Sequence, residues 1–302
     1  MLQTLVTLPL LRPDLFQTGI LAKHSIAGVL LFGPPGTGKT MLAKAAAKSS
    51  GANFMSVSLS DIFDKYVGEG EKNVRAIFTL ARKLAPCIVF LDEVDALFGT
   101  RRSSETSSSK REIINEFMTE WDGLTSSNKS ITILGATNRP FDLDDAILRR
   151  MPRRVLIDLP TPAQRLAILK SHLKDDILSP TLSLDSIVEK TPLYSGSDLK
   201  NLCIAASLTS VKEHILRTSL PTSSTSEILS KMNEIEDWNT IPTTAGHFEQ
   251  ALKEVPPSLT DEMQTLVELR KWDEMYGDGG GKGKKKNAKA GWGFTPAPPL
   301  KK

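Results

Sequence analysis

The sequence predicts an α/β protein, with a mostly parallel sheet covered by helices on both faces and a smaller all-helical domain after it. Two observations predict this architecture. Short apolar runs alternate with helical patterns between residues 27 and 159, and after Pro160 only helical patterns follow. Strands that alternate with helices indicate parallel pairing, because each crossover carries a helix over one face of the sheet.

Five apolar runs are the expected strands. Their apolar character is continuous and rich in Val and Ile, which favours strands buried on both faces. The five runs are AGVLLF (27–32), NFMSVSL (53–59), CIVFL (87–91), ITILGA (131–136) and RVLIDL (154–159).

The helices are expected where apolar residues recur at helical spacing. Between the second and third strands, EKNVRAIFTLARKLA (71–85) has this spacing, and Pro86 marks its end. Beyond Pro160 the expected helices are TPAQRLAILKSHL (161–173), LDSIVEKT (184–191), SGSDLKNLCIAASLTSVKEHIL (195–216), HFEQALKEV (247–255) and LTDEMQTLVELRKWDEMY (259–276).

These patterns divide the chain into five parts. We expect a large α/β subdomain over residues 1–159 and a helical domain over residues 160–217. Residues 218–245 are rich in Ser, Thr and Pro and are expected to form a flexible connector. Residues 246–276 are expected to be the last helices of the helical domain, and the low-complexity segment 277–302 to be disordered.

The charge distribution argues against a nucleic-acid partner. The formal net charge of the 302 residues is +3, but the segment 277–302 carries seven Lys against one Asp, so the rest of the chain is near −3. A nucleic-acid-binding face would need basic or aromatic stripes in that part. The two cysteines, Cys87 and Cys203, form no metal-binding pattern and fit a reduced intracellular protein.

The stretch GPPGTGKT, which follows the first strand, predicts a phosphate-binding loop. It fits the spacing G-x-x-x-x-G-K-[ST], in which consecutive backbone N–H groups close around phosphate oxygens. Lys39 would reach the β- and γ-phosphates of ATP, and the Thr40 hydroxyl would bind Mg²⁺. The alternative is a chance match to a loose pattern. The expected contact residues are Gly33, Pro34, Pro35, Gly36, Thr37, Gly38, Lys39, Thr40 and Met41.

Polar residues at the ends of two further strands complete the expected site. In CIVFLDEVD the strand ends at Asp92, which would hold the metal, and Glu93, which would orient and polarise the attacking water. An acidic pair after a strand is, taken alone, usually a solvated turn. ILGATN ends at Asn138, whose amide would touch the γ-phosphate or the water if its strand lies beside the phosphate-loop strand; the alternative is the start of a turn.

At this point the chain resembles the AAA family of ring-forming ATPases, over nearly all of residues 5–276. GPPGTGKT, FLDEVD, GATNRP, LRRMPRR and SGSDL carry the resemblance in this order. It implies a P-loop NTPase sheet followed by a small all-α AAA lid domain, and a homo-oligomer, usually a hexamer, with nucleotide between neighbouring subunits. By the same resemblance, Arg149 and Arg150 match arginine fingers that reach the γ-phosphate of the adjacent subunit, and Gly196 lies near the adenine.

The segment DKYVGEGEK resembles the first pore loop of the family. The resemblance implies that Tyr66 and Val67, flanked by Lys65 and Gly68, grip an extended protein substrate that is threaded through a central pore. Without the family, the same residues form an exposed turn. The Ser-rich stretch 101–112 falls where relatives have a second pore loop.

Within the family, the chain is similar to the branch of spastin, katanin, the endosomal-sorting-complex disassembly ATPases and the outer-mitochondrial-membrane protein dislocases. KLAPCIVFLDEVDALF and EFMTEWDGL are most similar to the dislocases. Mislocalised mitochondrial outer-membrane proteins are therefore the first expected substrates, with microtubule severing or sorting-complex disassembly as the alternative.

The resemblance also bears on what precedes Met1. Relatives have a D-I-x-G loop that packs on the adenine before the segment matching LPLLRPDLF. Either the given sequence is a fragment or has an incorrect start, or adenine binding is expected to use the linker before Gly33 and the Gly196 region. Membrane attachment is expected only through a segment upstream of Met1. As given, the chain is expected to be cytoplasmic, or at the cytosolic face of the mitochondrial outer membrane if a longer chain carries an anchor.

Two other classes of function are weighed against a protein-remodelling motor. An inactive nucleotide-binding scaffold would lack the acidic pair, the arginine fingers or the aromatic pore residue, and all three features are present. A nucleic-acid motor would need the basic stripes that are missing outside the segment 277–302.

Overall fold

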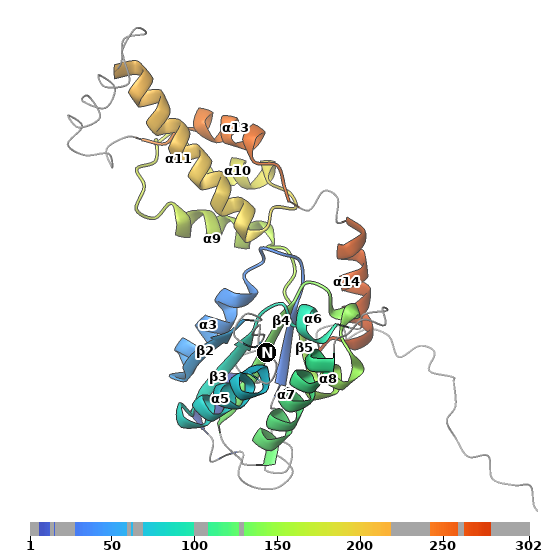
Figure 1. Cartoon of the computed structure of the whole chain (residues 1–302). Helices are drawn as coiled ribbons and strands as arrows, with labels where there is room; N and C mark the ends of the chain where they lie inside the picture. The colour runs from blue at the N-terminus through green and yellow to red at the C-terminus, as the bar shows by residue number, and fades with distance from the viewer. Residues whose placement is uncertain are drawn as a thin grey trace, which may run out of the picture.

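The computed structural model describes residues 6–12, 15, 28–58, 62, 69–99, 108–126, 130–218, 242–258 and 263–278. Figure 1 shows a sheet with helices packed around it and, above the carboxyl ends of its strands, a separate group of helices. We call these parts the large subdomain and the lid.

The sequence predicts a mostly parallel sheet, and every strand pairing in the sheet of the large subdomain is parallel. Its order is β2-β3-β4-β1-β5. The three central strands are completely buried, which explains their unbroken apolar sequences. The strands are β1 (Gly28–Phe32), β2 (Asn53–Val57), β3 (Cys87–Leu91), β4 (Ile131–Thr137) and β5 (Arg153–Leu156).

The last strand is shorter than the sequence indicated. The apolar pattern predicts a strand that runs to residue 159, but β5 ends at Leu156. Ile157 still donates its backbone N–H to the Phe32 carbonyl at 2.8 Å, and the chain then leaves the sheet. The Asp158 carboxylate accepts the backbone N–H of Leu159 at 2.7 Å, so a side chain replaces the strand partner there.

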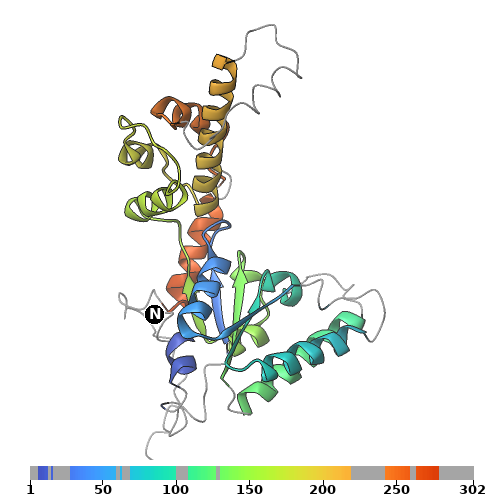
Figure 2. The same cartoon turned by 90° about the vertical axis from the view of Figure 1, so that its left-hand side faces the viewer.

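Helices cover both faces of this sheet (Figure 2). On one face α3 (Lys39–Ser50) packs with the short α1 (Leu8–Leu11), and their core contains Ala43, Ala47 and Leu10. On the other face lie α5 (Glu69–Lys83), α6 (Val94–Phe98) and α7 (Ser108–Ser126), with the fully buried Phe78 and Trp121 in their core. After β4, the chain forms η3 (Pro140–Asp142) and α8 (Asp145–Arg150) before it enters β5.

The lid has its own hydrophobic core. It is built by α9 (Pro162–His172), α10 (Leu184–Lys190), α11 (Gly196–Thr218) and α13 (Ala245–Glu254). A capping box starts α9: Gln164 donates its backbone N–H to the Thr161 hydroxyl, and its side chain accepts the Thr161 N–H. Leu169, Leu199 and Phe248 are almost completely buried in this core.

The final helix, α14 (Met263–Tyr276), corrects the expectation that residues 246–276 all belong to the lid. α13 packs on α11, but α14 packs beside β5 and η3 of the large subdomain (Figure 1). Its Leu269 and Trp272 join the large core, where the Trp272 ring meets Phe32 edge to face at 4.6 Å between centroids. Helical spacing shows which face of a helix is apolar, but not which core that face joins.

Candidate active site

The loop between β1 and α3 depends on glycine at three positions. Gly33, Gly36 and Gly38 have φ angles of +149°, +72° and +89°, which L side chains rarely adopt. A Cβ on Gly33 would lie 2.1 Å from the Ile157 carbonyl oxygen, so the residue that follows β5 packs directly against the loop. The loop therefore turns tightly just before the N-terminus of α3, and the N-terminus of a helix favours bound anions.

Lys39 lies inside this loop, with only 8% of its surface exposed. Its ammonium group donates to the Pro34 carbonyl at 2.7 Å and to the Gly33 carbonyl at 3.1 Å. Burial lowers the pKa of Lys39 to about 8, against the opposing effect of the Asp92 and Asp95 carboxylates. The Lys39 ammonium group is thus desolvated, and an anionic ligand would stabilise its charged form.

The acidic residues after β3 lie beside the start of α3. The Thr40 hydroxyl donates to the Asp92 Oδ2 at 3.1 Å, and the Glu93 backbone N–H donates to the Asp92 Oδ1 at 3.0 Å. Glu93 has φ 51° and ψ 47°, a left-handed conformation that costs free energy for a residue with a side chain. Such strain is concentrated at functional sites, and here it occurs in the residue that the sequence assigns to the attacking water.

The end of β4 lies directly beside the loop. β4 pairs with β1, with Thr137 opposite Phe32, so the condition set for Asn138 holds. The Gly33 backbone N–H donates to the Thr137 carbonyl at 3.3 Å. Asn138 is half-buried, and its side-chain oxygen is buried without a hydrogen-bond partner among the described residues. An unpaired buried amide oxygen is costly unless a bound group or water satisfies it.

Two residues of this region were not found from the sequence. The Thr137 hydroxyl donates to the Asp95 carboxylate at 2.6 Å and accepts the Arg139 backbone N–H at 2.9 Å. This pair joins the end of β4 to the acidic segment after β3. Asp95 could have been found from the sequence, because it is the last residue of FLDEVD. Thr137 could not, because it looked like part of a strand.

The lid reaches the same loop through the start of α11. The Ser197 backbone N–H donates to the Gly36 carbonyl at 3.1 Å, and a Cβ on Gly196 would come within 3.2 Å of that carbonyl oxygen. Ser195 and Asp198 form reciprocal caps at 3.2 and 2.9 Å, which fix the first turn of α11. Gly196, expected near the adenine, thus lies against the phosphate loop.

The two expected arginine fingers have different surroundings. Arg150 donates twice to the Asp122 carboxylate of α7, at 2.8 and 2.6 Å, and this bond holds the pKa of Asp122 below its usual value. Arg149 is exposed, and its side chain makes no hydrogen bond or ion pair with the residues that the structure describes. The Arg150–Asp122 pair spans 28 positions of sequence, which local patterns do not reveal.

Other expected residues lie apart from this arrangement. Met41, in the first turn of α3, is 75% exposed. The expected pore-loop residues Lys65, Tyr66, Val67 and Gly68 lie outside the described residues, as do positions 101–107 of the Ser-rich stretch.

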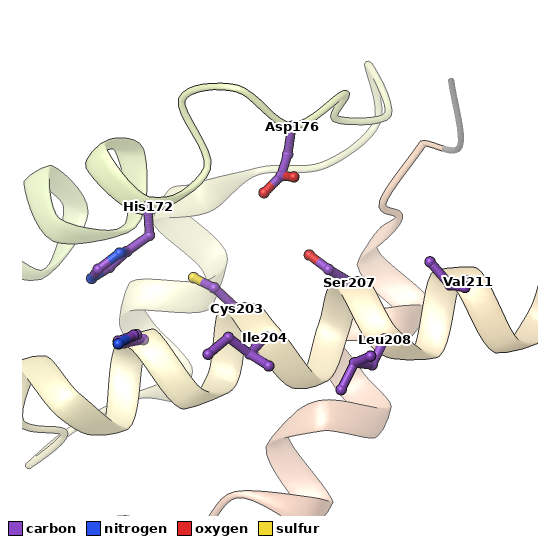
Figure 3. Close-up of a pocket in the computed structure, with 8 residues that line it drawn as sticks. His172, Asp176, Cys203, Ile204, Ser207, Leu208 and Val211 are labelled. Carbon is purple, nitrogen blue, oxygen red and sulfur yellow. The ribbon is translucent and has the colours of Figure 1, made fainter. Parts of the chain in front are cut away.

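The lid contains a separate hollow of about 320 Å³ between α9, the loop after it and α11 (Figure 3). It lies along α11 from Lys200 to Val211, beyond the turn that touches the phosphate loop. Asp176 lies over the part of α11 that carries Cys203 and Ser207. Burial, with a smaller effect of Asp176, raises the pKa of Cys203 to about 12, so this thiol is not a nucleophile at neutral pH.

The loop residues fit a nucleoside triphosphate with a divalent cation. Backbone N–H groups and Lys39 suit phosphate oxygens, while the hydroxyl of Thr40 and the carboxylate of Asp92 lie 3.1 Å apart and supply the hard oxygen donors that Mg²⁺ takes beside phosphate and water. Among the described residues, no group of three or more His, Cys, Asp or Glu forms a metal site of its own. No helix in the described parts is long and apolar enough to span a bilayer.

A glycine-rich phosphate loop, an acidic strand end beside it and a helical lid in contact with the loop define a P-loop nucleoside triphosphatase. Comparison with known proteins gives the family. The model of the "ATPase family associated with various cellular activities (AAA)" matches residues 29–159, and that of the AAA+ lid domain matches residues 181–223. The chain belongs to the AAA family of ATPases, which bind nucleotide.

Similar proteins include spastin, a katanin-like protein and FIGL-1. Spastin of Gallus gallus is 43% identical over 92% of this chain and 42% of its own length, and a katanin p60 ATPase-containing protein of Sorex araneus is 39% identical over 92% and 55%. The crystal structure of the FIGL-1 AAA domain with ADP is 36% identical, with a TM-score of 0.75 over 92% of this chain and 86% of that one. The chain thus spans about half the length of the curated relatives it matches.

Proposed function

We propose that this chain binds ATP with Mg²⁺ at the loop of residues 33–40 and hydrolyses it within a homo-oligomeric ring, a hexamer, to remodel protein substrates. The observation that carries the proposal is the meeting of four groups at the carboxyl edge of β1, β3 and β4: Lys39, the Thr40–Asp92 pair, the strained Glu93 and Asn138. Open parallel sheets bind their ligands at this edge.

Each of these residues has a role that its chemistry suits. Lys39 and the loop N–H groups hold the phosphates, and Thr40 and Asp92 hold the cation or its waters. The bound cation supplies charge neutralisation at the phosphates. Glu93 accepts a proton from the attacking water and orients it, while the buried amide of Asn138 positions that water or the γ-phosphate.

The exposed position of Arg149 supports the ring. Arg149 projects from α8 with no partner among the described residues of its own chain, and we propose that it completes the site of a neighbouring subunit. An arginine that reaches transferring phosphate is worth about 10³ to 10⁵ in rate. Arg150, bound to Asp122, is the inner member of the pair.

The substitution Glu93→Gln tests the catalytic part. It removes the base but keeps the shape of the side chain, so Mg·ATP binding should persist and turnover should fall by about 10²-fold or more. The measurements are equilibrium binding of a fluorescent ATP analogue and steady-state phosphate release. Glu189→Gln, on an exposed position of α10 in the lid, is the matched control and should hydrolyse ATP like the unchanged protein. Full turnover in Glu93→Gln would remove Glu93 from the mechanism.

The substrate is a protein gripped by the segment 65–68, and two identities compete. The likeness to spastin and katanin favours action on microtubules, while the dislocase-like sequence stretches favour extraction of mislocalised outer-membrane proteins at the cytosolic face of mitochondria. Tyr66→Ala should retain ATPase activity and lose substrate remodelling. Severing of polymerised tubulin and extraction of a tail-anchored protein from liposomes, measured side by side, decide between the two.

A further inference from the structure

Arg154 ties the end of α8 to α14. Although it belongs to β5, its guanidinium group turns back to α8, where Nη2 donates to the Leu148 carbonyl at 2.8 Å and Nε to the Met151 carbonyl at 3.3 Å. These two carbonyls flank the pair Arg149 and Arg150.

The C-terminal end of α8 needs such a donor. The last carbonyls of a helix have no partner within the helix, and a helix of six residues has little stability of its own. At the N-terminal end, the Asp144 carboxylate caps α8 by accepting the Ala146 backbone N–H at 2.8 Å. At the C-terminal end, the side chain of Arg154 satisfies carbonyls. The direction of the last turn thus depends on where Arg154 is held.

α14 holds Arg154 on its other side. The guanidinium carbon lies 5.6 Å from the centre of the Trp272 ring and 5.8 Å from that of Tyr276, within the range of cation–π attraction. The backbone of Arg154 also pairs with Asp278: it accepts the Asp278 N–H at 2.9 Å and donates to the carboxylate at 3.3 Å. Trp272 is anchored in the large core, so Arg154 sits on a fixed support.

Arg149 lines a hollow that Arg154 and the aromatic residues of α14 also line. This hollow of about 520 Å³ lies between η3, α8 and α14, and Arg149, Arg154, Trp272 and Tyr276 are all on its wall. The expected finger and its support therefore share one surface. A shift of Arg154 would reach Arg149 through one turn of helix.

We propose that Arg154 is a positioning residue for Arg149: it transmits the packing of α14 to the C-terminal turn of α8 and so holds Arg149 in the orientation needed at the neighbouring subunit's nucleotide. This inference rests on the proposed function, in which Arg149 acts across the subunit boundary. Arg154 itself touches no nucleotide.

The first test is the substitution Arg154→Met, which keeps a long side chain against Trp272 and Tyr276 but removes the donors to Leu148 and Met151. A misplacement of about 1 Å at a reacting group costs about 10²-fold, so kcat should fall about 10- to 100-fold. The dissociation constant for Mg·ATP should change less than about twofold, because the loop of the same subunit is untouched. Arg153→Met is the matched control: among the described residues its side chain forms an ion pair with Asp278 at 3.6 Å and no hydrogen bond to α8, so kcat should be retained.

Two further measurements separate positioning from general damage. In the double variant Arg149→Ala, Arg154→Met, turnover should equal that of Arg149→Ala alone, since a positioning residue has nothing left to position. Rings mixed from Arg154→Met and Glu93→Gln subunits should recover activity, because the first retains an intact loop and the second an intact finger. A further loss in the double variant, or no recovery in mixed rings that do assemble, would overturn the proposal.

A third measurement needs no hydrolysis. The backbone amides of residues 147–151 should exchange with deuterium about 10-fold faster in Arg154→Met than in the unchanged protein, while those of α3 should not change. If the unchanged protein hydrolyses no ATP, the proposed function fails, but this comparison still decides whether Arg154 holds α8. Equal exchange in α8 refutes the inference. Should Arg154→Met not fold, Arg154→Lys, which keeps the charge without the planar fork, replaces it with an expected loss in kcat of about 3- to 10-fold.

Discussion

The lowered pKa of Lys39 predicts that nucleotide affinity falls as the solution becomes more alkaline. In the free protein, burial brings this pKa to about 8, so the ammonium form that pairs with phosphate is depleted above that pH. Binding of the triphosphate requires the protonated form and therefore takes up a proton. Affinity is fully present below pH 8 and is lost as the pH rises through it.

The size of the effect follows from that pKa. With a value of about 8, the protonated fraction drops about eightfold between pH 7.5 and pH 9, so the dissociation constant for Mg·ATP should rise by about the same factor, which is about 1.2 kcal/mol of binding free energy. The phosphates of ATP are already ionised over this range. One lysine cannot give a slope steeper than tenfold per pH unit.

The assay is equilibrium titration with a fluorescent ATP analogue and Mg²⁺ at half-unit pH steps from 7.5 to 9.5. Lys39→Ala should bind more weakly and with no slope over this range. Lys48→Ala removes an exposed lysine from the other end of α3 and should keep both the affinity and the slope. A flat profile in the unchanged protein, or the same slope in Lys39→Ala, refutes the reasoning.

Three more substitutions have definite outcomes. Gly33→Ala should abolish Mg·ATP binding and lower the melting temperature, because its Cβ would lie 2.1 Å from the Ile157 carbonyl oxygen; Gly51→Ala, where the Cβ meets open space, should bind normally, and normal binding by both would contradict the steric argument. Trp272→Ala should cost about 3 to 5 kcal/mol of unfolding free energy in urea titration. Met275→Ala, at a position of α14 that is 67% exposed, should cost less than about 0.5 kcal/mol, and equal effects would show that α14 is not anchored by its tryptophan. Asn138→Ala should keep Mg·ATP affinity within about threefold and lower kcat by about 10²-fold in steady-state phosphate release, and unchanged turnover would exclude the amide from the reaction.

The sheet could be predicted from the sequence because its three central strands are buried on both faces. Such strands have continuous apolar sequences, and β3 was placed at its observed bounds, Cys87–Leu91. The phosphate loop was equally visible, since glycines with positive φ, a lysine and a hydroxyl must follow one another along the chain. In both cases the residues that form the element are neighbours in the sequence, so a local pattern is enough to predict it.

The relations that join distant segments could not be predicted in the same way. The Arg150–Asp122 pair, the Arg154 bridge to α14 and the Ser197–Gly36 contact depend on how helices pack, and no local pattern encodes them. The assignment of α14 to the lid was wrong for the same reason. Its apolar face suits either core, and only three-dimensional packing against Phe32 selects the large one.

The route of the chain into α14 has a consequence for biosynthesis. The large subdomain is discontinuous: its core takes residues from the first half of the sequence and then Leu269 and Trp272, with the whole lid in between. A ribosome releases the N-terminal part first, at about 5 to 20 residues per second. The lid can therefore fold before α14 has been synthesised and covers the Phe32 side of the sheet. During that interval the uncovered apolar surface is a binding site for a chaperone.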